Sequence, residues 1–251
     1  MKSKAIIVIV IIAALFIGTI IAVVVPWGRK NNGEYIYRAF SDHVELIEYI
    51  GDGYDVTVPD EIDGLPVTIV GSGTFKGNVK LEKVTLGNNV TELGTNAFRG
   101  CTTLSDVVLD HKLETLGSGC FANCTSLSYF NVPSTVTAFE GEVFYGCTGL
   151  TRIILPNAPK FQSIGSSAFR GCTQLKSIVI PEGISSIGTK IFQDCTSLKS
   201  VTLPKTLIYI ANKAIFKNCD SLEEIQVVEG SKAEVWCGNH GFAELLKYAG
   251  H

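Results

Sequence analysis

Apolar residues recur along the chain in a pattern that repeats about every 23 residues. Each unit has a phenylalanine, a leucine six residues later, and apolar residues nine and eleven residues later, as at Phe169, Leu175, Ile178 and Ile180. The seven phenylalanines are Phe75, Phe98, Phe121, Phe144, Phe169, Phe192 and Phe216. Because apolar positions alternate at the end of the unit, each unit is predicted to contain a short strand with one buried face.

One such unit cannot bury its apolar side alone, but stacked units can. The repeat therefore predicts a solenoid of about seven 23-residue coils over residues 71–228. Its strands are expected to lie in a parallel sheet, about 4.8 Å apart. Proline ends a strand because it cannot donate to a ladder, and four units carry one there. These prolines are Pro133, Pro156, Pro181 and Pro204.

Two further features of the repeat concern its turns. A glycine lies four residues before most of the phenylalanines, as at Gly94 and Gly165, and predicts a turn with positive φ. Where Glu140 replaces this glycine, the turn is expected to move to Gly141. The unit with two extra residues, within 156–168, is expected to form a loop that bulges outward.

Both ends of a solenoid need caps. Residues 34–70 contain the strand-like segments EYIYRAF, VELIEYI and YDVTVP and predict an N-terminal β cap. Residues 229–251 predict a helical cap at the other end, since Ser231-Lys-Ala-Glu234 forms a capping box. A second helical face is expected after it, made by Phe242, Leu245, Leu246 and Ala249.

The first residues of the chain predict attachment to a membrane. After a short tail, residues 1–4, residues 5–27 form an uncharged run long enough to cross a hydrocarbon core of about 30 Å as one transmembrane helix. A cleaved signal peptide would have a shorter apolar region and a better cleavage site than Ala22 offers. Residues 28–33 then form a tether, and the short tail predicts that the large domain lies on the far side of the membrane.

Charge and motifs exclude several function classes. The chain has 21 basic and 24 acidic residues and no block of lysine and arginine, which argues against nucleic-acid binding. None of the familiar hydrolase, metalloprotease or nucleotide-binding motifs is present, and the four histidines stand in no recognisable pattern. We therefore predict no catalytic residue, no cofactor and no metal site, and the protein is not expected to be an enzyme.

Six of the eight cysteines occupy one column of the repeat. They are Cys101, Cys124, Cys147, Cys172, Cys195 and Cys219. The main expectation is that they pack as small buried residues. A disulfide ladder between coils is an alternative if the domain lies outside the cytoplasm, although side chains in register lie farther apart than a disulfide needs. Metal ligation is disfavoured, because the spacing supplies no paired ligands.

The outward positions of the predicted strands form columns that could bind a partner. Most are polar, but Val108, Ile154 and Val179 are apolar, and Tyr129, Asn131 and Arg152 lie beside Ile154 and Val179. Tyrosine and arginine are enriched at binding hot spots, so Tyr129, Asn131, Arg152, Ile154 and Val179 form the candidate partner-binding site. The alternative is that the branched residues are present only because they favour strands.

The pattern G-x-x-A-F-x-x-C-x-x-L-x-x-I-x-I-P, intact from Gly165 to Pro181, resembles the BspA-like leucine-rich repeats. The resemblance covers roughly residues 34–228, and the segment DGLPVT at 63–68 is similar to that family's first repeat. It implies a leucine-rich-repeat solenoid of α/β class, dominated by β structure. It also implies exposure at a cell surface, protein-binding or adhesive roles, and no catalytic residues.

Together these features predict a membrane-anchored, cell-surface protein that binds another protein or a surface glycan without catalysing a reaction. Residues 5–27 would hold it in the membrane, with the repeats outside. The alternative is a membrane-tethered intracellular scaffold of the same fold, in a compartment where the cysteines would stay reduced.

Overall fold

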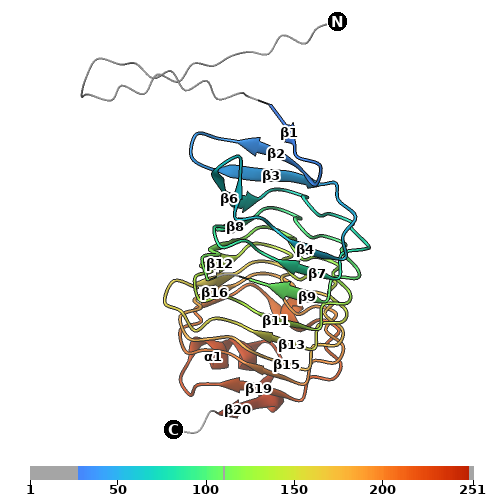
Figure 1. The fold of residues 1–251 in the computed structure, drawn as a ribbon. Helices are drawn as coiled ribbons and strands as arrows, with labels where there is room; N and C mark the ends of the chain where they lie inside the picture. The colour runs from blue at the N-terminus through green and yellow to red at the C-terminus, as the bar shows by residue number, and fades with distance from the viewer. Residues whose placement is uncertain (1–27, 110, 249–251) are drawn as a thin grey trace, which may run out of the picture.

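Each turn of the chain contributes two strands, and the strands of successive turns form two parallel ladders (Figure 1). The computed structural model describes residues 28–109 and 111–248. Within them the chain winds into a β-solenoid of about nine turns. Figure 1 shows the turns stacked in sequence order, from β1 at one end to β20 at the other.

Ladder B contains the strands that the repeat predicts. Its members are β4 (Asp55–Thr57), β7 (Lys83–Thr85), β9 (Asp106–Val108), β11 (Tyr129–Asn131), β13 (Arg152–Ile154), β15 (Ser177–Val179), β17 (Ser200–Thr202), β19 (Glu224–Val227) and β20 (Leu246–Tyr248). It is interrupted twice, between β9 and β11 and between β13 and β15. Each of the four prolines lies two residues beyond the end of its strand.

Ladder A was not predicted. It contains β3 (Val44–Tyr49), β6 (Leu65–Val70), β8 (Glu92–Leu93), β10 (Thr115–Leu116), β12 (Ala138–Phe139), β14 (Ser163–Ile164), β16 (Ser186–Ile187) and β18 (Tyr209–Ile210). Its repeat strands are only two residues long, too short to show an alternating pattern. A second buried column, exemplified by Val90 and Leu93, was the available signal.

The N-terminal end of the solenoid is closed by antiparallel strands. Strand β1 (Lys30–Asn31) pairs with β2 (Tyr35–Ala39), and β2 pairs with β3. A short hairpin joins β5 (Glu61–Ile62) to β6. Strand β4 lies in the segment YDVTVP and pairs in parallel with β7, so the solenoid path already begins in this region.

The C-terminal end differs from the expected pair of helices. Helix α1 (Lys232–Asn239) begins at the capping box: the Ser231 hydroxyl accepts from the backbone N–H of Glu234 at 3.1 Å, and the Glu234 carboxylate accepts from Gly230. The second helical face was wrong. The chain instead makes a 3₁₀ turn, η2 (Ala243–Leu245), and then β20, which satisfies the open edge of β19.

The predicted fold class was wrong in two respects. The strands β4 and β20 lengthen ladder B at both ends, so the solenoid has about nine turns rather than seven coils. Within residues 28–109 and 111–248, helix is confined to α1, η2 and one further 3₁₀ turn, η1 (Lys213–Phe216), which makes the fold of these residues a β-solenoid rather than α/β. None of the helices in the described ranges has the length and apolar character to cross a membrane. The predicted span, residues 5–27, lies outside the described residues.

Stacked phenylalanine rings form the centre of the core. Neighbouring rings lie nearly parallel, with centroids from 4.8 Å apart at Phe75–Phe98 to 5.9 Å apart at Phe169–Phe192. Five of the seven, from Phe98 to Phe192, are completely buried. Because each ring packs on the rings of the coils before and after it, the core is continuous along the solenoid axis.

The glycine column has a different role from the one predicted. Residues with positive φ lie two positions later, at Gly73, Asn96, Gly119, Glu142, Ser167 and Lys190. The column itself is crowded by backbone, because a Cβ at Gly165 would lie 2.5 Å from the carbonyl carbon of Glu140. The expected shift of the turn to Gly141 was also wrong, since Glu142 keeps the register.

The two extra residues do not simply bulge outward. They fall between β13 and β14, where Ala158 and Phe161 turn into the core. The Phe161 ring contacts Phe139 edge-on, with centroids 5.2 Å apart. The insertion therefore adds apolar packing as well as exposed chain.

Candidate binding face

Four of the five predicted site residues pair across two adjacent strands. Tyr129 lies opposite Arg152, and Asn131 lies opposite Ile154, on β11 and β13. Val179 lies on β15, in the next coil and beyond an interruption of ladder B. The Tyr129, Ile154 and Val179 side chains are 47%, 37% and 62% exposed. We call these five residues the binding face.

The charges around the binding face differ in how they are paired. Lys83 lies 3.9 Å from both Asp55 and Asp106, and Lys199 lies 3.0 Å from Glu223. Within the part of the chain that the structure describes, Arg152 makes no ion pair and its side chain no hydrogen bond, although it lies between these pairs on the same ladder. Its guanidinium and the exposed Tyr129 ring are therefore available to a partner.

An open groove of about 470 Å³ adjoins the binding face, between β9 and β11. Its lining includes Val107, Leu109, Tyr129, Phe130 and Asn131. Val107 and Leu109 belong to core columns, yet both are only partly buried, whereas Phe130 beside them is 2% exposed. Sequence reasoning missed this groove. The one signal was Phe130, the only aromatic residue in a column of valine and isoleucine.

The column cysteines satisfy backbone carbonyls in the core. Each thiol donates to the carbonyl of the phenylalanine in the preceding coil, at 3.0–3.2 Å. At Phe98, for example, the carbonyl accepts from the backbone N–H of Cys101 and from the Cys124 thiol, both at 3.1 Å. The first repeat has Asn78 in this slot, and no repeat phenylalanine precedes it.

All eight cysteines are buried and free, so the structure contains no disulfide ladder. Burial raises the pKa of the Cys147 thiol from its ordinary value of 9.0 to about 12. Burial likewise raises the pKa of Cys101 and Cys219 to about 12 and that of Cys237 to about 11. These thiols are therefore poor nucleophiles and serve packing.

The raised thiol pKa values predict that stability falls in alkaline solution. Near pH 7, well below the ordinary thiol pKa of 9.0, the thiols are protonated in both folded and unfolded chains. Between about pH 9 and 12 the unfolded chain releases protons that the folded chain holds, so unfolding becomes more favourable as pH rises. We expect the urea midpoint, measured by circular dichroism, to begin to fall at about pH 8 and to fall most steeply above pH 9.

The Cys147→Ala variant controls for the other groups that titrate in this range. It removes one thiol and is expected to reduce the slope above pH 9. A midpoint that falls equally steeply in wild type and variant would contradict the attribution to buried thiols.

Residues 68–160 and 142–235 match the family model for the BspA-type leucine-rich repeat region, in six copies. The chain belongs to the BspA-type leucine-rich-repeat family. The match covers more than half of the sequence and confirms the resemblance that the repeat pattern indicated.

The BspA-type chain is also similar to solved leucine-rich-repeat structures. One is TpLRR of T. pallidum, with 26% identity and a TM-score of 0.56 over 89% of this chain and 100% of that one. Another, from Bacteroides ovatus, has 19% identity and a TM-score of 0.51, covers 88% of this chain and 76% of that one, and supports the fold alone. The sequence matches no curated protein.

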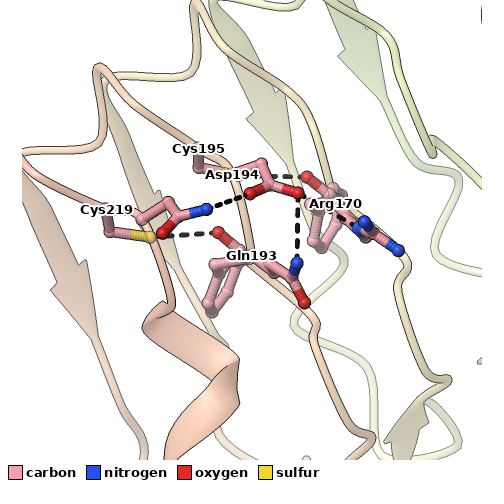
Figure 2. A network of polar contacts seen from close by, with 8 residues as sticks. Arg170, Gln193, Asp194, Cys195 and Cys219 are labelled. Atoms are coloured by element: carbon pink, nitrogen blue, oxygen red, sulfur yellow. Dashed lines mark hydrogen bonds and ion pairs between the residues drawn. The ribbon is translucent and has the colours of Figure 1, made fainter.

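A polar network ties together three BspA-type coils near the C-terminal end (Figure 2). The Asp194 carboxylate accepts from Arg170 Nε at 3.2 Å, from Gln193 Nε2 at 3.2 Å and from Asn218 Nδ2 at 2.6 Å. Burial opposes ionisation, but the hydrogen bonds from Asn218 and Arg170 outweigh it and lower the pKa of Asp194. Every donor is a neighbouring side chain, so the network orders the turns, where Asp194 has a φ of +65°.

Metal binding finds no support in the arrangement of side chains. Across residues 28–109 and 111–248, no three histidine, cysteine or acidic side chains gather where they could hold an ion. The candidate site consists of an exposed tyrosine and arginine, apolar neighbours and an adjoining groove.

Proposed function

We propose that this protein binds a partner protein through the binding face of ladder B. The pairing of Tyr129 with Arg152 across β11 and β13 carries the proposal. Both side chains project from the paired strands β11 and β13, which form the middle segment of ladder B, and Ile154 adds apolar area beside them. A rigid sheet holds such residues in place before the partner arrives, which lowers the entropic cost of binding.

The proposal is non-catalytic. The coils of this chain repeat their core residues and differ more at the outward positions of ladder B, and such surfaces suit recognition better than chemistry. The side chains that recur at fixed positions of the coils lie in the core or at its edge. They are the phenylalanines, the leucines and the column cysteines.

We further propose that the repeats are displayed outside a membrane. The support comes from sequence: residues 5–27 are uncharged and apolar, and the BspA-like resemblance implies surface exposure. Residues 28–33 then act as the tether, and β1 already includes Lys30 and Asn31 from it.

Binding is tested with the full chain, purified in a mild detergent, against arrays of purified surface proteins and of glycans. At least one surface protein is expected to bind with saturation in biolayer interferometry. The double variant Tyr129→Ala/Arg152→Ala is expected to weaken that binding at least tenfold, because aromatic and arginine anchors dominate such interfaces.

A matched variant keeps the test specific. Tyr209→Ala/Lys205→Ala removes an exposed tyrosine, 59% exposed on ladder A, together with an exposed lysine four residues before it in the sequence, and is expected to leave binding unchanged. Equal losses of affinity in both double variants would contradict the assignment of the binding site to ladder B. Binding only to glycans would replace the protein partner by a sugar.

A further inference from the structure

Ladder B is open between β9 and β11, and the opening is a groove rather than a packed seam. Intact steps repeat two kinds of backbone bond: Ser105 N–H donates to the Glu82 carbonyl at 2.9 Å, and Leu86 N–H donates to the Val108 carbonyl at 2.9 Å. The described contacts include no such bond from Ser128 to Ser105 or from Leu109 to Asn131. These backbone groups therefore border the groove with hydrogen-bonding capacity left over.

The floor of the groove is apolar because β11 does not cover the core-facing residues of β9. Val107 and Leu109 point to the core side of β9, but the missing contact with β11 leaves both partly exposed. Their counterparts in the coil before, Val84 and Leu86, are 0% and 5% exposed. An extended chain that entered the groove would cover this surface with alternate side chains.

Phe130 distinguishes the coil on one side of the groove from the other coils. Its ring packs between Phe121 and Phe144, with centroids 5.0 and 4.8 Å away, and it is larger than the valine or isoleucine found at this position in every other coil. Pro133 also lines the groove. The large side chain at this position is therefore a feature of this coil alone among the seven repeats.

The charge of the lining indicates which side chains would fit. Asp106 is the only carboxylate among the described lining residues, and that lining contains no lysine or arginine. Lys83, 3.9 Å from Asp106, is 40% exposed and pairs with it only loosely. A basic side chain next to the apolar ones would therefore complement the rim.

We propose that the groove between β9 and β11 binds an extended segment of the partner protein as an added strand. Apolar side chains of the segment contact Val107 and Leu109, and a basic side chain between them faces Asp106. Its backbone pairs with the free edges of β9 and β11, as in other cases of strand addition. This inference rests on the proposed function and locates the first contact of the partner beside Tyr129.

The test uses the full chain in detergent and a fluorescein-labelled peptide of sequence TLKLT, which alternates leucine with polar residues. Fluorescence anisotropy is expected to show saturable binding. Methylation of the backbone nitrogens of its central residues is expected to weaken binding at least tenfold, and TLELT, with the opposite charge, is expected to bind more weakly than TLKLT.

Two variants of the protein locate the binding. Leu109→Lys places a charge on the groove floor and is expected to abolish binding of TLKLT, whereas Ile208→Ser, at an exposed position outside the groove lining, is expected to leave it unchanged. Circular dichroism checks that both are folded. Phe130→Ile offers a second route, since a smaller side chain is expected to close the groove and lower the affinity.

No saturable binding of TLKLT up to millimolar protein would overturn the proposal, as would equal binding of the methylated peptide. Neither result bears on the effect of Tyr129→Ala/Arg152→Ala on partner binding. The binding face and the groove are therefore tested separately.

Discussion

Replacing Phe144 with alanine is expected to lower the free energy of unfolding by about 3–5 kcal/mol. The ring is completely buried and stacks on Phe121 and Phe169, with centroids 5.7 and 5.8 Å away. Alanine would leave a cavity at the middle of the core, where rigid coils on both sides limit collapse. Urea unfolding followed by circular dichroism measures the loss.

The position of Phe144 adds a second expected result. Repeat proteins gain stability from contacts between neighbouring coils, so a cavity at the centre uncouples the two halves. We expect the Phe144→Ala transition to broaden or split, while Tyr129→Ala, an exposed position, stays within about 0.5 kcal/mol of wild type. A narrow transition with a small loss would show that the phenylalanine stack does not hold the core together.

Gly165→Ala is the second change with a large expected effect. The added Cβ would lie 2.5 Å from the carbonyl carbon and oxygen of Glu140 and 2.7 Å from the backbone nitrogen of Gly141. Backbone cannot move aside here without parting two coils, so the expected loss is about 3 kcal/mol, the upper part of the range for overpacking. Thermal unfolding with a fixed heating rate detects it as a lower melting temperature.

Gly238→Ala is the matched control for this prediction. Gly238 lies in α1, with no atom within 4 Å of an added Cβ, so alanine is expected to stabilise the chain by about 0.5–1 kcal/mol. If Gly165→Ala were as harmless as Gly238→Ala, the close approach of coils at the glycine column would be wrong.

The sequence was most informative where one residue type recurs in one environment. The phenylalanine, leucine and branched positions indicated ladder B and its buried face. A pattern that recurs in seven coils remains recognisable even where single coils carry substitutions. The strands at 35–39 and 44–49 were also readable, since their apolar residues alternate over five or six positions.

Other features depended on contacts between coils, which spacing cannot show. Gly165 looks the same in sequence whether it is needed for positive φ or for close approach, and only the position of Glu140 distinguishes them. The segment after Gly241 has a helical pattern, but β19 offers an open edge that makes a strand more favourable. The groove arises from a mismatch between β9 and β11, so neither strand predicts it alone.

The role of the column cysteines could be predicted from the sequence only in part. Their regular spacing indicated a packing role, but their hydrogen bonds to phenylalanine carbonyls one coil earlier require the stacked structure. The bond from Cys172 Sγ to the Phe144 carbonyl spans 3.2 Å even though two extra residues lie between β13 and β14, in the chain that joins the two coils. The core register is thus kept where the surface loop changes.

The central claim is that the solenoid presents ladder B to a partner outside the cell. An epitope placed after His251 tests it most directly, with antibody staining of intact and permeabilised cells that produce the full chain. The account predicts equal staining in both. Staining only after permeabilisation would contradict it and would make the protein an intracellular scaffold of the same fold.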